Sequence, residues 1–368
     1  MMHTVESILI GILVLSVVVF VHELGHYLAA RWRHIKVDVF SIGFGPALTS
    51  WYDRAGTRWQ LSALPLGGYV KLHGFGGDDS SDEAVDDDEA FHRKPVLSRA
   101  IVTVMGPVFN FIFTIIIFIG LFGFYGHSEV RPDVGEIEPG SVAQKAGLHV
   151  GDHLTSLNGR TLLGVADLQA QISAHPGENV TLGLSRQGQD LALPLTLGEK
   201  GQAGHKTGYL GVRFSIVIGK ALPFYEAVPM AFEKTWDLCV QVLQSVWQII
   251  SGQRSASQLS GTIGIIHASG QVAHYGWVSL LLFVAAISTS LGLFNLFPIP
   301  MLDGGHLVFY AAEAIMGRPV SERVQGYALQ AGLSLVLVLF LFTGYNDLRN
   351  LGFFHKIESI SHWVFSQH

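Results

Sequence analysis

The chain begins with an almost uninterrupted apolar run that ends directly in a motif with two histidines. The run covers residues 7–21, and the sequence His22-Glu-Leu-Gly-His26 follows it. A helix rises about 1.5 Å per residue, so a helix through this segment reaches most of the way across the roughly 30 Å hydrocarbon core of a bilayer. We therefore predict a first transmembrane helix that carries ionisable side chains near one of its ends.

The spacing of these polar residues indicates a metal site. Residues i and i+4 lie on the same face of a helix, so His22 and His26 can bind one metal ion together. Glu23 lies beside this pair, where a carboxylate can act as the general base of hydrolysis. Soluble zinc proteases carry the same His-Glu-x-x-His motif on a helix of a globular domain. Its position at the end of an apolar run predicts hydrolysis inside a membrane.

The composition agrees with a polytopic α-helical membrane protein. Hydrophobic residues make up 49% of the chain and charged residues only 14%, whereas soluble domains carry about 25% charged residues. The net charge of −6 is largely local, because eight acidic residues lie within residues 78–89. No basic patch suggests a nucleic-acid partner, and the single cysteine, Cys239, excludes an intrachain disulfide framework.

A cleaved signal peptide is the alternative explanation of the first apolar run. Residues 1–6 contain no Lys or Arg, and no small-residue cleavage site precedes the motif. Cleavage would also remove the most chemically specific residues of the chain. We therefore expect this span to be retained.

Four apolar segments are long enough to cross a bilayer, which takes about 20 residues. They predict transmembrane helices at residues 1–33, 99–126, 277–306 and 324–345, with a C-terminal tail at 346–368. Basic residues cluster after the first span, before the second, and between the third and fourth (Arg31, Arg33, Lys36, Arg93, Lys94, Arg99, Arg318 and Arg323). Cytoplasmic loops are enriched in Lys and Arg. The motif is therefore predicted near the cytoplasmic face and both termini on the outer side.

The segment at residues 34–98 reads neither as a span nor as an ordinary loop. Short runs around Gly and Pro, such as residues 40–46 and 67–72, predict a membrane-associated β-hairpin or small sheet. A solvated acidic loop is expected at residues 78–90. Next to a site in the membrane, the free edge of the sheet could pair with an extended substrate. A purely structural sheet is the alternative.

A separate domain is predicted at residues 127–200, between the second and third spans. The pattern Ala-Gly-Leu-x-x-Gly-Asp-x-Leu at residues 146–154, followed by Asn-Gly, resembles a PDZ domain of the bacterial protease type. The domain would be inserted and α+β, and only one copy is visible. Tight turns are expected at three glycines and a small core at three apolar side chains (Gly147, Gly151, Gly159, Val142, Ala146 and Leu148).

A linker with an amphipathic helix is predicted at residues 201–276. The helix itself is expected at residues 221–251. Phe224, Trp236 and Trp247 are suited to a membrane interface, where aromatic side chains are enriched.

The third span ends in a second motif, Asn-x-x-Pro-x-Pro-x-Leu-Asp-Gly-Gly, at residues 295–305. A zinc site with two histidines needs a third protein ligand, and Asp303 is the best candidate, with His306 as the alternative. Pro298 and Pro300 break the helix and can place Asp303 opposite the first motif. Irregular backbone at membrane depth is tolerated only where it lines a polar cavity.

Together the two motifs resemble the site-2 protease family of intramembrane zinc metalloproteases (peptidase family M50), over nearly the whole chain. The segments at residues 43–45, 67–71 and 259–265, with the PDZ-like insert, look like its bacterial regulator-of-sigma-E protease branch. The resemblance implies a Zn²⁺ ion on His22, His26 and Asp303, with Glu23 as the base. It also implies substrate contacts at Asn295, at Pro298 and Pro300, and at Gly67 and Gly68.

The same resemblance implies a bacterial inner-membrane enzyme in a stress response. Its substrates would be transmembrane segments of single-pass proteins, namely an anti-sigma factor already trimmed by another protease, and remnant signal peptides. The PDZ domain would bind exposed C-termini of trimmed substrates or exclude untrimmed ones. Two departures are visible: members of this branch often carry two PDZ domains, and many have Asn where Ser290 stands.

Two other functions are left open by the residues. One is a non-proteolytic PDZ scaffold in the membrane with a vestigial metal site, and the other is a metal transporter. The retained Glu23 argues against the scaffold. Asn110, a lone amide within the second span, is predicted to form a hydrogen bond between helices rather than to take part in catalysis.

Overall fold

The structure is a computed structural model that describes residues 2–74, 88–126, 128–162, 164–200, 207–253, 255 and 259–350. The chain forms two compact units, one of residues 1–120 with 224–368 and one of residues 121–223. We call them the helical unit and the inserted unit. Most of the predicted acidic loop, and residues 351–368 of the predicted tail, lie outside the described residues.

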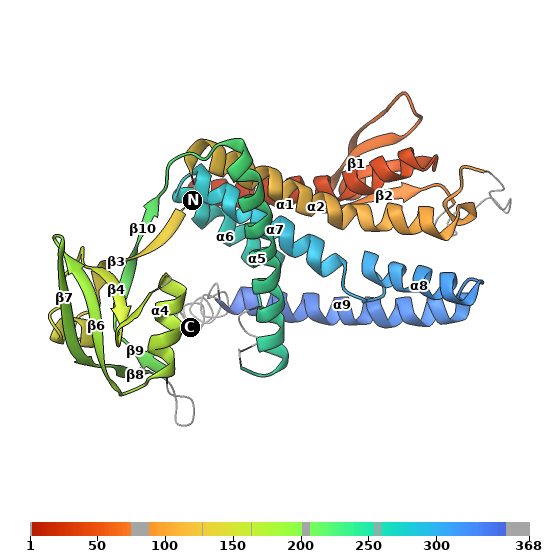
Figure 1. Cartoon of the computed structure of the whole chain (residues 1–368). Coiled ribbons are helices and arrows are strands. Elements are labelled where there is room, and N and C mark those ends of the chain that lie inside the picture. Colours follow the sequence, from red (N-terminus) through yellow and green to blue (C-terminus); the bar gives the residue numbers. More distant parts are fainter. Residues whose placement is uncertain are drawn as a thin grey trace, which may run out of the picture. The chain divides into compact units, whose positions relative to one another are not determined.

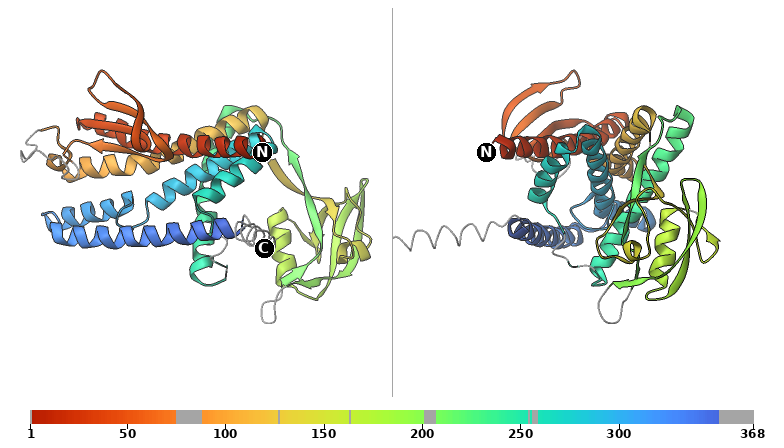
Figure 2. Two further views of the ribbon diagram at one scale, coloured as in Figure 1. Left: turned by 180° about the vertical axis from the view of Figure 1, so that it is seen from behind. Right: turned by 90° about the vertical axis from the view of Figure 1, so that its left-hand side faces the viewer.

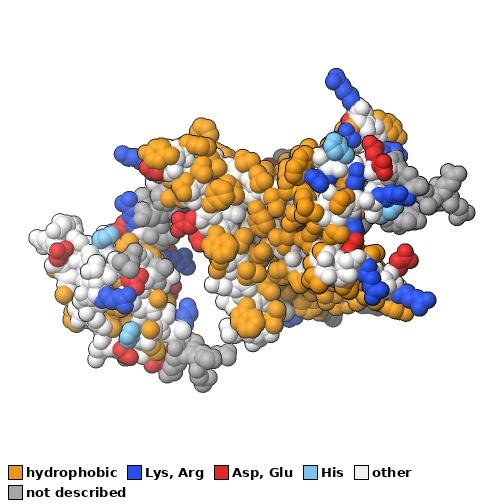
Figure 3. Space-filling view, turned by 45° about the vertical axis from the view of Figure 1, so that its right-hand side comes forward, with side chains coloured by type: hydrophobic (Ala, Val, Ile, Leu, Met, Phe, Trp, Pro, Cys, Tyr) orange, Lys and Arg blue, Asp and Glu red, His pale blue; other side chains and the backbone are white. Residues whose placement is uncertain are grey.

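Within the described residues, four helices are long and apolar enough to cross a membrane. They are α1 (Met2–Trp32), α2 (Val96–Tyr125), α7 (Trp277–Asn295) and α9 (Glu322–Asn350) (Figure 1). Their outward surface is apolar: Leu9 is 62% exposed and Phe340 60%, and hydrophobic side chains cover much of the face drawn in Figure 3. Such a surface is unfavourable in water and is expected of helices in contact with lipid. The prediction of four span-length helices is confirmed.

The third predicted span, at residues 277–306, is not one helix. α7 ends at Asn295, and a separate helix, α8 (Asp303–Met316), begins eight residues later. The prolines between them have no backbone N–H to donate, and Met301 takes a left-handed backbone conformation (φ 88°). α8 was not predicted; it lies alongside α9 in both Figure 1 and Figure 2.

The segment after the first span forms an antiparallel β-sheet, as predicted. Its two long strands are β1 (Val37–Tyr52) and β2 (Arg58–Leu72). Residues 39–42 pair with 58–61 on one side and with 68–71 on the other, and 47–52 pair with 58–62. The strands therefore curl into four paired segments, and residues 68–72 form one edge. A Cβ at Gly43 (φ 91°) would lie 2.8 Å from the Leu64 carbonyl oxygen, so the bend in β1 requires glycine.

Aromatic packing fixes this sheet to the end of α1. Phe40 is fully buried and stacks on Trp59 with ring centroids 4.2 Å apart. Tyr27 of α1 contacts both rings edge-on, and its hydroxyl donates to Asp53 at 2.7 Å. The sheet is thereby held against the turn of α1 that follows His26.

The linker region contains more structure than predicted. Outside the linker, at the end of the segment at residues 34–98, a 3-10 helix (Phe91–Arg93) precedes α2. The expected amphipathic helix is confirmed as α5 (Phe224–Ile250), and a further helix, α6 (Thr262–His274), follows it. The aromatic side chains predicted for an interface are exposed: Phe224 at 73%, Trp236 at 69% and Trp247 at 65%.

The inserted unit is a small antiparallel sheet with short helices. Its elements are β3 (Ser128–Ile137), α3 (Val142–Lys145), β4 (His153–Leu157), β5 (Arg160–Thr161), α4 (Val165–Ala174), β6 (Asn179–Arg186), β7 (Gln189–Thr196), β8 (Gly198–Lys200), β9 (Thr207–Tyr209) and β10 (Val212–Ile218). The main sheet has the order β10-β3-β4-β6-β7. Because β10 pairs with β3, this unit continues past the predicted boundary at residue 200.

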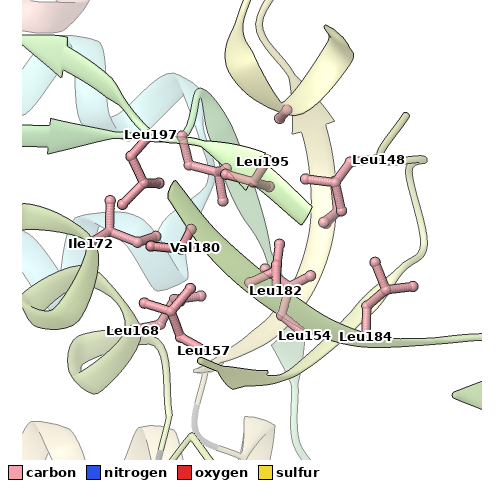
Figure 4. Packing of buried hydrophobic residues seen from close by; sticks show 13 residues of the cluster. Leu148, Leu154, Leu157, Leu168, Ile172, Val180, Leu182, Leu184, Leu195 and Leu197 are labelled. Carbon is pink, nitrogen blue, oxygen red and sulfur yellow. The ribbon is translucent and has the colours of Figure 1, made fainter. Parts of the chain in front are cut away.

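The core of the inserted unit lies between its sheet and α4. Leu154, Leu168 and Leu182 are at most 1% exposed and point toward one another in Figure 4. The three apolar residues predicted for this core belong to it or pack against it (Leu148, Val142 and Ala146). The three predicted turn glycines have positive φ angles between 77° and 93° (Gly147, Gly151 and Gly159). Both local predictions are confirmed.

Candidate metal centre

The structure brings together the three side chains that the sequence suggested as metal ligands. The Nε2 atoms of His22 and His26 lie 3.2 Å apart, one helical turn apart on α1. The Asp303 Oδ2 atom lies 3.2 Å from the first and 3.5 Å from the second. One ligand atom from each of the three falls within 4.8 Å of the others. Their side chains are 9%, 13% and 17% exposed.

Asp303 reaches the histidines because the chain turns sharply between α7 and α8. The two glycines that follow it have no room for a side chain: a Cβ at Gly304 would lie 2.2 Å from the Phe297 carbonyl oxygen, and one at Gly305 would lie 2.4 Å from that of Ile299. The first turn of α8 therefore packs directly on the preceding backbone. This close approach explains the Asp-Gly-Gly sequence.

Helix α2 supplies the contacts behind both imidazole rings. The Nδ1 atom of His26 lies 2.9 Å from the Val102 carbonyl oxygen, to which it donates, so its Nε2 lone pair faces Asp303. The Nδ1 atom of His22 lies 3.1 Å from the side-chain amide of Asn110, which is fully buried. The predicted interhelical hydrogen bond of Asn110 is confirmed, but its partner is a candidate ligand.

Glycines allow α1 and α2 to approach at this point. A Cβ at Gly25 would lie 2.2 Å from the Met105 carbonyl oxygen, and a Cβ at Gly106 would lie 2.3 Å from Nε2 of His26. Gly106 was not predicted as part of the site. The signal in the sequence is the pair of Gly106 and Asn110, which lie one turn apart on α2.

Glu23 faces a cavity of about 280 Å³ that also exposes the three candidate ligands. One wall is the sheet edge: Gly68, Tyr69 and Val70 line the cavity, and the backbone of Val70 hydrogen-bonds the Glu23 carboxylate. A Cβ at Gly68 would lie 3.3 Å from Cγ of Glu23. The edge segment and the candidate base are therefore in direct contact.

The other predicted substrate residues divide into two groups. Asn295 lines the cavity and its amide nitrogen donates to the Leu291 carbonyl oxygen at 3.1 Å. The cavity lining does not include Pro298, Pro300 or Gly67. Pro300 packs instead under α9, where a Cβ at Gly332 would lie 2.0 Å from its carbonyl oxygen.

His306 also lines the cavity. In the part of the chain that the structure describes, the cluster of ligand-type side chains comprises His22, His26 and Asp303 without it. The arrangement therefore favours the carboxylate over His306 as third ligand. The ligand roles themselves stay a prediction.

The residues present fit a zinc ion. Asp303 Oδ2 is buried with no hydrogen-bond partner, and such an atom is costly unless something pairs with it. Two imidazole nitrogens converge on the same oxygen. Two nitrogens and one carboxylate oxygen are the protein ligands of many catalytic zinc sites, which keep a fourth position open. The arrangement fits the site of a hydrolytic metalloenzyme.

The chain belongs to Peptidase family M50, which it matches over residues 10–339. It is similar to "Metalloprotease MmpA" of Caulobacter vibrioides, at 35% identity over 387 residues, 94% of this chain and 96% of that protein. It is also similar to "Putative zinc metalloprotease mll0638" of Mesorhizobium japonicum, at 40% identity over 353 residues, 91% of this chain and 96% of that one. "Putative zinc metalloprotease Atu1380" of Agrobacterium fabrum is 38% identical over 360 residues, 92% and 95% of the two chains.

These similarities agree with the metal centre. The chain is a member of a zinc metalloprotease family, and its cofactor is Zn²⁺.

Proposed function

We propose that this protein is an intramembrane zinc endopeptidase that cleaves transmembrane segments of single-pass membrane proteins. The observation that carries the proposal is the convergence of His22, His26 and Asp303 beside Glu23, at the end of a helix long enough to span a bilayer. Ionisable side chains at membrane depth are rare and usually functional.

The proposed mechanism divides the work among the side chains of the cavity. Zinc, when bound by the two histidines and Asp303, supplies Lewis-acid polarisation of a carbonyl and acidification of water. Glu23 accepts a proton from the attacking water and delivers it to the leaving amine. The Asn295 amide, which also lines the cavity, would orient the substrate backbone. The surrounding apolar helices limit the access of bulk water.

The sheet edge is the proposed binding site for the substrate backbone. Residues 68–72 are paired on one side only and line the cavity beside Glu23. An exposed edge can add an extended strand through main-chain hydrogen bonds. A transmembrane helix must unwind locally before its peptide bond can be cleaved, and strand addition would hold it extended.

We further propose that the inserted unit is a periplasmic PDZ domain. By resemblance to the bacterial branch, the enzyme would lie in the inner membrane, and its substrates would be an anti-sigma factor trimmed by a first protease and remnant signal peptides. The inserted unit would restrict access by untrimmed substrates, or it would bind the new C-termini of trimmed ones. If deletion of residues 128–218, which contain all the strands of the inserted unit, left cleavage of an untrimmed substrate as slow as before, the gating role would be wrong.

The variant Glu23→Gln tests the protease directly. We expect it to retain zinc while cleavage of a transmembrane substrate falls to background, since the amide cannot accept the proton. Glu233→Gln, an exposed acid on α5, is the matched control and should behave as wild type. Unchanged biological output of Glu23→Gln would support the alternative of a non-proteolytic scaffold.

A further inference from the structure

A second cavity adjoins the metal cavity in the helical unit. Its volume is about 560 Å³, and its walls come from the 3-10 helix, the start of α2, α8, the connection at residues 319–321 and α9. Phe91 and His306 line both cavities, so the two spaces meet at these two side chains. We call this second cavity the outer cavity.

One wall of the outer cavity is charged and firmly held. Arg99 donates to Glu313 at 2.6 Å, and the two side chains are only 14% and 15% exposed. The Arg99 guanidinium also lies over the ring of Tyr310, 5.1 Å from its centroid, and its Nε donates to the Lys94 carbonyl oxygen. Tyr310 in turn stacks with His306. This wall connects the outer cavity to the edge of the metal cavity.

The lining also contains polar side chains from α9 and the connection before it, among apolar ones such as Val320 and Leu329. The polar side chains are those of Ser321, Glu322 and Gln325, and Gln325 donates to the Val320 carbonyl oxygen at 2.7 Å. Charged side chains gather around this end of the helical unit in Figure 3. Ligand sites in proteins combine a mostly apolar lining with a few placed polar groups. The ion pair and these polar side chains can therefore bind the polar groups of a peptide chain, while the apolar side chains contact the rest of it.

We propose that the outer cavity binds the polar flank of the substrate on the cytoplasmic side of the cleaved bond. This inference rests on the proposed function. A substrate chain held along residues 68–72 passes through the metal cavity, and the outer cavity is the adjoining space of the size of a ligand site (roughly 300–1,000 Å³). The basic residues near it predict that it lies on the cytoplasmic side.

The test compares two substrates with the same cleaved segment. One retains its polar cytoplasmic flank and the other ends just beyond the cleaved bond. In the full-length protein, Ser321→Trp fills the outer cavity, and Gln325→Trp fills it from α9. Val324→Trp, 53% exposed and outside the lining, is the matched control.

We expect both filling variants to raise KM for the flanked substrate by about tenfold with kcat little changed, and to leave the truncated substrate unaffected. The control should change neither. Equal effects on both substrates, or no effect on the flanked one, would overturn the proposal. If the wild-type protein cleaves neither substrate, the proposed function fails instead.

A different observation concerns the side chain behind His22. Asn110 is fully buried, and its Oδ1 atom has no hydrogen-bond partner while its amide nitrogen faces Nδ1 of His22. The oxygen and nitrogen of an amide exchange places by a 180° rotation. With Oδ1 turned to the ring, Asn110 accepts the Nδ1–H and leaves the Nε2 lone pair toward Asp303.

The geometry points to Asn110 as a positioning residue that sets the tautomer of His22. The Val102 carbonyl does the same for His26. With its nitrogen toward the ring, the amide of Asn110 would donate to Nδ1 of His22. The ring proton would then sit on Nε2, and that atom could not bind a metal.

Zinc affinity, measured by chelator competition, tests this role. We expect Asn110→Leu to weaken zinc binding by about 10- to 100-fold and Asn110→Asp, which keeps an acceptor, to restore it to within a few-fold of wild type. Thr114→Val removes a buried hydroxyl one turn further along, bonded to the Ala285 carbonyl at 3.1 Å, and should bind zinc normally. The role is refuted if Asn110→Leu binds zinc as tightly as Thr114→Val does. It is also refuted if Asn110→Asp binds zinc as weakly as Asn110→Leu.

Discussion

Two buried carboxylates, one in each unit, are held in opposite ways. Asp152 in the inserted unit is 1% exposed and accepts hydrogen bonds from Arg186 at 2.8 and 2.7 Å and from the backbone of His149 at 2.8 Å. Asp303 in the helical unit has a buried oxygen without a hydrogen-bond partner, facing two imidazoles. A satisfied carboxylate stabilises a fold, whereas an unsatisfied one marks a place for a ligand.

Substitution of Asp303 should have the largest effect. We expect Asp303→Ala to lose stoichiometric zinc and to reduce cleavage by on the order of 10³-fold or more, because one of three protein ligands is removed. Zinc content of the purified protein and the cleavage rate are the measurements. Full zinc occupancy in this variant would break the comparison.

Substitution of Asp152 should act on stability and not on zinc. We expect Asp152→Asn to reduce the free energy of unfolding of the inserted unit by about 2–4 kcal/mol, somewhat less than for a fully buried pair because Arg186 is partly exposed. Hydrogen exchange in the full-length protein measures this change. Loss of zinc from Asp152→Asn would contradict the assignment.

A third buried carboxylate sharpens the comparison within the helical unit itself. Asp347 of α9 is 2% exposed and accepts from the backbone N–H groups of Gly261 and Gly264, at the start of α6. It therefore caps α6 from another helix. We expect Asp347→Ala to cost about 1–2 kcal/mol, as for loss of a helix cap, with zinc binding retained. Thermal unfolding and zinc content measure the two effects. Loss of zinc would show that Asp347, like Asp303, contributes to zinc binding.

The pH dependence should show the smallest effect. The hydrogen bonds from Arg186 hold the pKa of Asp152 below its usual range, against the opposing effect of burial. The stabilisation is therefore present above the unfolded pKa of about 3.9 and is lost as the pH falls through the lower, folded value. Hydrogen exchange of the inserted unit between pH 5 and pH 3 measures it, relative to Asp152→Asn. Identical slopes for the two proteins would remove Asp152 as the cause.

Local patterns in the sequence predicted a large part of this protein. Apolar runs of span length predicted α1, α2, α7 and α9, and Gly and Pro punctuation predicted the sheet after α1. The i, i+4 spacing predicted that His22 and His26 share a helix face. These features depend on neighbours within a turn or a strand, where backbone geometry alone decides which side chains meet.

The sequence alone could not predict contacts between distant segments. It proposed Asp303 as a partner of the first motif, but only the turn between α7 and α8 decided that this carboxylate, and not His306, joins the histidine cluster. It predicted a hydrogen bond between helices for Asn110 but did not identify His22 as the partner. It also ended the inserted unit too early, because the pairing of β10 with β3 joins strands far apart in the chain.

The motif at residues 22–26, at the end of an apolar run, was thus enough to predict the class of chemistry and its setting. The other residues of the site, Val102 and Asn110 on α2 and Asp303 on α8, lie some 80 and 280 positions away in the chain. Those distances are closed by the packing of α1 on α2, for which Gly25 and Gly106 leave space, and by the turn before α8, for which Gly304 leaves space. Such close approach is a property of two packed surfaces together, so no single stretch of sequence determines it.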